Sequence, residues 1–129
     1  EQIMMTSRHT SHANAALSTL IVLQLTMLAA LFAQSAPHPP ATISLFAIAP
    51  FLAAALSAAT AALVVGPLDS AAGRVLSVLA ALMALLSYGP QKYLDAQFAL
   101  IWPAVIAGQV AAVAVIWLAF TATSRRSNT

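Results

Sequence analysis

Four long apolar runs, separated by short segments rich in polar residues or proline, dominate the pattern of this chain. The runs cover residues 13–34, 42–65, 71–88 and 96–121. Each is close to the roughly 20 apolar residues that a helix needs to cross a hydrocarbon core about 30 Å thick. The pattern predicts an all-α integral membrane protein in which four antiparallel transmembrane helices form an up-down-up-down bundle.

The segments between the runs carry recognisable helix-ending and helix-starting residues. Residues 35–41 contain three prolines, which remove backbone donors and restrict their neighbours, so a loop is expected there. A Gly-Pro pair follows the second run at 66–67 and the third at 89–90, as is common where helices stop. Asp69 and Asp95 precede the third and fourth runs, and we expect their carboxylates to cap the free amides.

These boundaries predict one transmembrane domain over residues 13–122. A polar N-terminal tail is expected at 1–12 and a cytoplasmic C-terminal tail at 123–129. Residues 1–5 are interpreted as a tag remnant or an upstream start, since Met4 and Met5 can both serve as initiators. The length admits four crossings with short connections and leaves no room for a separate soluble domain.

Composition strengthens the membrane interpretation and removes several function classes. Hydrophobic residues make up 61% of the chain and charged residues 6%, whereas about a quarter of the residues in soluble domains are charged. The five basic residues are scattered through tails and loops, so no nucleic-acid partner is expected. The chain contains no cysteine, which excludes disulfides, thiolate metal sites and cysteine nucleophiles.

The distribution of positive charge predicts the orientation, because Lys and Arg concentrate in cytoplasmic loops. Four of the five basic residues flank one side of the predicted bundle: Arg8, Arg74, Arg125 and Arg126. The other side has only Lys92, partly offset by Asp95. We therefore expect a bacterial inner membrane protein with both termini in the cytoplasm. Trp102 and Trp117, near opposite ends of the fourth run, are typical interfacial anchors.

The second half of the chain resembles the first. Residues 25–33 align with 76–84, an offset of 51 (76 minus 25), and residues 45–50 align with 98–103, an offset of 53 (98 minus 45). Pro50 coincides with Pro103 in the second alignment. The similarity predicts two repeated helical hairpins related by an axis along the membrane normal. Chance similarity between Ala- and Leu-rich helices is the alternative.

Small residues indicate which helices pack closely. Ala104, Gly108 and Ala112 form a ladder at four-residue spacing on the fourth run, and small residues also crowd positions 54–62 of the second. Small side chains let helix backbones approach each other in lipid. We expect Ala104, Gly108 and Ala112 to form a helix-packing face, and the second and fourth helices to lie at the centre.

No Asp, Glu, Lys, Arg or His lies well within a predicted span; Arg74 is near a span end, where it can reach the interface. Proton-coupled transport usually needs an ionisable group inside the membrane. The three histidines, His9, His12 and His38, fall in predicted tails or loops. We therefore expect no metal site and no cofactor bound by an intramembrane histidine. Peripheral contacts with lipid or pigment are compatible with the sequence.

Two buried amides and one loop are the candidate sites. Gln24 and Gln109 lie deepest in the predicted spans, where an interhelical hydrogen bond contributes about 1 kcal/mol; lining a polar cavity is the alternative role. Tyr88, Lys92, Tyr93 and Asp95 cluster on the outer side but match no catalytic arrangement. Their default role is interfacial anchoring and capping, and a partner-docking loop is the functional alternative.

These features predict a non-catalytic accessory or structural subunit of a larger membrane complex, of respiratory or photosynthetic type. Its expected partners are membrane lipids and other membrane subunits or further copies of itself. An enzyme is disfavoured because no catalytic residues and no buried acid–base groups are found. The alternative is a small oligomeric transporter or channel, which would need Gln24, Gln109, Ser57 and Thr60 to converge on a weakly polar path.

Overall fold

The described part of the chain, residues 2–33, 45–88 and 98–127 of a computed structural model, is almost entirely helical. Its helices are α1 (Gln2–Ala33), α2 (Leu45–Val65), α3 (Ala71–Tyr88) and α4 (Phe98–Ser127). Three of them contain segments long and apolar enough to cross a membrane, namely Ser7–Ala33, Ile48–Val65 and Trp102–Arg125, while α3 is a shorter apolar helix. The all-α class with membrane-length helices is thus confirmed.

The helix boundaries agree with the sequence pattern near the middle of the chain and depart from it at both ends. The end of α2 and both ends of α3 lie where the pattern predicts. In contrast, α1 begins at Gln2, so the segment predicted as a polar tail is helical. Residues 2–12 contain neither glycine nor proline, so nothing in them stops a helix. Likewise α4 continues through most of the predicted C-terminal tail.

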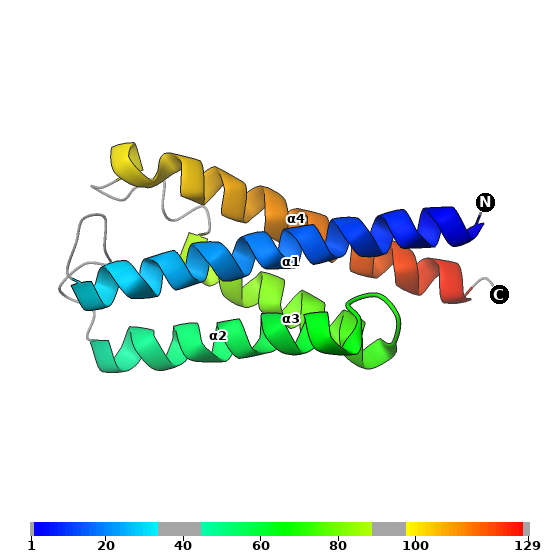
Figure 1. Ribbon diagram of the computed structural model, residues 1–129, viewed down its shortest axis with the longest axis horizontal. Coiled ribbons are helices and arrows are strands. Elements are labelled where there is room, and N and C mark those ends of the chain that lie inside the picture. The colour runs from blue at the N-terminus through cyan, green and yellow to red at the C-terminus, as the bar shows by residue number, and fades with distance from the viewer. Residues whose placement is uncertain (1, 34–44, 89–97, 128–129) are drawn as a thin grey trace.

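The helices form a ring of contacts. Neighbouring pairs are α1 with α2, α2 with α3, α3 with α4, and α4 with α1, and α1 also contacts α3 across the bundle. Figure 1 shows the N-terminus, the C-terminus and the turn between α2 and α3 at the same end. Over the described ranges α2 and α4 are not in contact. The expectation that the second and fourth helices occupy the centre is therefore wrong, because α1 and α3 make the central contact.

The core is built mainly from alanine, with larger buried side chains on α1, α2 and α4. Leu17 and Leu20 are completely buried and pack against alanines of the other three helices and against Val115. A second cluster lies toward the termini and contains Ala13, Leu68, Leu118, Ala119 and Ala122. Because α1 contributes leucines where α3 contributes alanines, the two central helices fill the core unequally.

The pattern of burial along α2 recurs along α4. From Pro50 to residue 64, each position has the same degree of burial as the position 53 residues later, except residue 54 and its counterpart 107. The alignment of 25–33 with 76–84 behaves differently. Ala29 is exposed whereas its counterpart Ala80 is buried, and Ala33 is exposed whereas Ala84 is buried. Positions 53 residues apart on α2 and α4 therefore have matching burial, whereas positions 51 residues apart on α1 and α3 do not.

The turn between α2 and α3 is held by backbone geometry and a serine cap. Gly66 has a φ of 90°, a left-handed conformation that commonly ends helices and favours glycine. The Ser70 hydroxyl oxygen accepts a hydrogen bond from the Gly73 amide at 3.0 Å. Ser70 therefore caps the first turn of α3, directly after the predicted capping residue Asp69.

The first turn of α3 lies directly against this connector. A Cβ atom added to Gly73 would overlap the carbonyl oxygen of Gly66. The buried hydroxyl of Ser77 lies 2.8 Å from the carbonyl oxygen of Gly73 and 3.2 Å from that of Pro67, positioned to donate to either. The side chain of Arg74 reaches the Leu68 carbonyl at 3.5 Å. These contacts hold the first turns of α3 against the connector.

Candidate functional site

The polar residues that a transport path would need are divided between the interior of the bundle and two outward depressions. Gln24 is 1% exposed and faces the interior from α1. Ser57 and Thr60 line a shallow depression formed by α2 alone. Gln109 lies beside Trp117 in another depression formed by α4 alone. Since α2 and α4 are not in contact over the described ranges, Ser57 and Thr60 do not share a path with Gln109.

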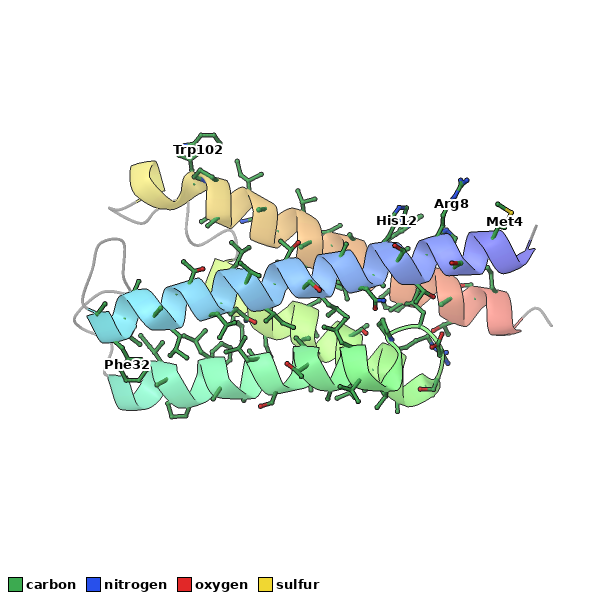
Figure 2. All side chains as sticks on the ribbon, viewed as in Figure 1. Met4, Arg8, His12, Phe32 and Trp102 are labelled. Carbon is green, nitrogen blue, oxygen red and sulfur yellow. The ribbon has the colours of Figure 1, made fainter. Side chains whose placement is uncertain are left out.

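A larger groove of about 580 Å³ runs between α1 and α4. Figure 1 shows α4 moving away from α1 toward its yellow N-terminal end, where the two ribbons are well separated. Trp102, labelled in Figure 2, is half exposed at that end of the groove. The groove is lined by Ala15, Ala16, Thr19, Trp102, Pro103, Ile106, Ala107, Val110, Ala111 and Ala114.

The groove offers little hydrogen-bonding capacity. Its one side chain with a hydroxyl, Thr19, donates that hydroxyl to the Ala15 carbonyl at 2.9 Å within α1. Thr26, further along the same helix, makes the equivalent bond to the Val22 carbonyl at 2.8 Å. Such bonds satisfy a hydroxyl inside its own helix. The groove therefore suits apolar occupants such as acyl chains or hydrophobic side chains.

The small-residue ladder of α4 belongs to the interior of the bundle. Ala112 is completely buried in the main core cluster, Gly108 is also buried, and Ala104 is half-buried. The ladder thus packs within the chain itself.

The predicted docking loop falls mostly outside the described residues. Tyr88 is the last residue of α3, while Lys92, Tyr93 and Asp95 lie in the segment 89–97, outside the described ranges. Their role as a docking loop stays a prediction.

Arginine side chains gather at the end of the bundle that carries the termini. Arg8 lies near the start of α1, Arg74 in the first turn of α3 and Arg125 near the end of α4, and Figure 1 shows these three regions at one end. The Nε atom of Arg125 donates to the Thr121 carbonyl at 3.3 Å. Among the described residues no three His, Asp or Glu side chains are grouped to hold a metal ion.

Two buried nitrogen atoms are features that the pattern alone could not reveal. The Nδ1 atom of His9 and the Nε2 atom of Gln24 are buried without a hydrogen-bond partner within the described ranges. His9 was expected in a solvated tail, but it lies on α1 and is half-buried. Gln24 was expected to bond another helix, and its amide nitrogen has no such bond there.

The helices and their apolar outer faces define a helical membrane protein. Outward-facing large side chains on α3 and α4, among them Val75, Leu79, Trp102 and Trp117, suit contact with lipid or with other membrane-embedded surfaces. No protein-family model, curated protein or solved structure matches the chain.

Proposed function

We propose that the chain is a non-catalytic accessory or structural subunit of a larger membrane protein complex, of respiratory or photosynthetic type. The main support is the contrast between its interior and its surface. The interior is lined mainly by alanine and leucine side chains, while Ser57, Thr60 and Gln109 face outward from α2 and α4. A transporter or channel formed by several copies is less well supported, because Ser57, Thr60 and Gln109 line outward depressions on separate helices.

In this proposal the four helices cross a bacterial inner membrane as an antiparallel up-down bundle with cytoplasmic termini. The shared location of Arg8, Arg74 and Arg125 supports that orientation. With 18 residues, α3 is about 27 Å long, slightly less than a typical hydrocarbon core. The long side chain of Arg74 can extend from the first turn of α3 to the interface.

The proposal also treats the chain as two repeated helical hairpins. Pro50 and Pro103 each lie five residues after the start of their helix, at Leu45 and Phe98. The matching burial of α2 and α4 at the same offset supports this interpretation.

Isolation of the protein from its native membrane in a mild detergent tests the subunit proposal. Mass spectrometry and an absorption spectrum of the purified material should reveal co-purifying membrane proteins, with or without pigment. A lone homodimer without other proteins or pigment would contradict the proposal.

Two matched substitutions locate the contact surface. Ala15→Leu places a larger side chain in the groove between α1 and α4, whereas Ala53→Leu makes the same change on the exposed face of α2. If the groove receives a partner, Ala15→Leu lowers the yield of co-purified protein and Ala53→Leu does not. The combined change Lys92→Ala with Asp95→Ala tests the outer loop in the same assay, and unchanged assembly would remove its docking role.

A further inference from the structure

Gln24 is a buried amide whose nitrogen has no hydrogen-bond partner among the described residues. The side chain is 1% exposed, and no described residue accepts a hydrogen bond from Nε2. Leaving such a donor unpaired in the interior costs about 1–3 kcal/mol. Because the side chain is almost completely buried, bulk water does not reach the amide to relieve that cost. An acceptor from outside the protein chain would remove the penalty.

The helical register places a second polar side chain at about the same depth. Leu20 and Ala84 belong to one core cluster, and α1 and α3 are in contact and run in the same direction (Figure 1). Gln24 lies four residues beyond Leu20, about 6 Å along α1, and Ser87 lies three residues beyond Ala84, about 4.5 Å along α3. Both side chains are buried, Ser87 being 8% exposed.

The other two helices contribute small residues to the same layer. Counting back along α2 from Ala59 of the core cluster by one turn leads to Ala55, which is completely buried. Counting back along α4 from Ala112 by one turn leads to Gly108, which is also buried. The layer therefore combines two polar side chains with two residues of minimal volume, beyond a core of apolar side chains.

We infer that Gln24 and Ser87 mark an interior binding position for a small neutral molecule that presents an acceptor oxygen. The Gln24 amide donates to that oxygen, and the Ser87 hydroxyl can donate or accept. A neutral occupant fits because no charged side chain belongs to the buried set of the described residues. The oxygen can come from a water molecule, which needs two to four polar partners, or from a carbonyl or hydroxyl group of an apolar ligand.

Unfolding measurements on Gln24→Met in lipid bilayers test whether the position is occupied. Methionine keeps the length of the side chain but cannot donate. If an occupant accepts from Nε2, the substitution raises the unfolding equilibrium constant about fivefold or more, because that hydrogen bond is lost. If the position is empty, methionine removes an unpaired buried amide and the constant falls, which would overturn the inference. Leu20→Met, one turn away, controls for the general effect of methionine in this core.

A double substitution tests whether Ser87 shares the occupant. Ser87→Ala should weaken folding less in the Gln24→Met background than in the wild type, because side chains that hold one molecule have coupled effects. Strictly additive effects would exclude Ser87 from the position.

The two sources of oxygen are separated spectroscopically and chemically. With ¹⁵N-labelled glutamine, a cross-peak between the Gln24 side-chain amide and the water resonance identifies water. An oxygen-containing molecule that organic solvent extracts from wild-type protein but not from Gln24→Met identifies an apolar ligand. The absence of both signals contradicts the inference.

Discussion

The close approach of Gly73 to the turn before α3 predicts that Gly73→Ala destabilises the bundle. On an exposed helical site this change would stabilise by about 1 kcal/mol, because alanine is the better helix former. Here the added Cβ overlaps the Gly66 carbonyl oxygen, and that oxygen also accepts the Asp69 amide at 3.4 Å. Forcing an atom into a filled site costs about 1–3 kcal/mol.

The opposing atom is backbone, so it cannot move away by rotating a side chain. Moving it would disturb both the left-handed Gly66 and the hydrogen bond from Asp69. We therefore expect the steric cost to lie in the upper part of its range and to exceed the gain in helix propensity, with a net loss of up to about 2 kcal/mol. Reversible unfolding by SDS in mixed bicelles, followed by circular dichroism, measures the change.

The neighbouring residue supplies a matched control. Ala72 is exposed in the same helical turn, so Ala72→Gly reports helix propensity alone and should cost about 1 kcal/mol. A gain for Gly73→Ala equal in size to that loss would refute the close approach, because propensity would then account for both substitutions.

Three further predictions rest on which side chains are buried and which are exposed. Ser77→Ala should destabilise by about 1 kcal/mol in the same unfolding assay, since it removes a buried hydroxyl that donates to the Gly73 or the Pro67 carbonyl; no change would show that the hydroxyl contributes nothing to stability. Leu20→Ala should cost about 2–5 kcal/mol, whereas Leu82→Ala, on an exposed position, should cost much less; equal losses would argue against the core assignment. Trp102 and Trp117 are exposed near opposite ends of the apolar part of α4. Lipids brominated near the interfaces should therefore quench tryptophan fluorescence more strongly than lipids brominated at the bilayer centre. Strongest quenching at the centre would contradict the role of both tryptophans as interfacial anchors.

The sequence pattern predicts a helix boundary correctly where particular residues end or start a helix. Gly66 followed by Pro67 identifies the end of α2, and the polar residues after it identify the start of α3. The start of α1 has no such signal, because residues 2–12 are polar yet contain nothing that breaks a helix. Hydropathy therefore marks where the apolar segment begins, while the helix itself begins at Gln2.

The arrangement of the helices was harder to predict because alanine occurs on every face of α2. Ala55 is completely buried and Ala53 is exposed, so small residues do not distinguish an inner face from an outer one. The same ambiguity affects polar candidates. Gln24 and Gln109 look equivalent in the sequence, but one is buried in the bundle and the other lines an outward depression.

The ring of helix contacts contains one neighbouring pair that no loop joins directly. Consecutive helices are joined by the chain, so α4 and α1 are the one neighbouring pair in the ring held together without a direct connection. Apart from the turn at Gly66–Ser70, the hairpins α1–α2 and α3–α4 are held together by packing alone, through the contacts of α2 with α3, α1 with α4 and α1 with α3. Gly73 and Ser77 contact that turn directly, so the one covalent link between the hairpins is also closely packed.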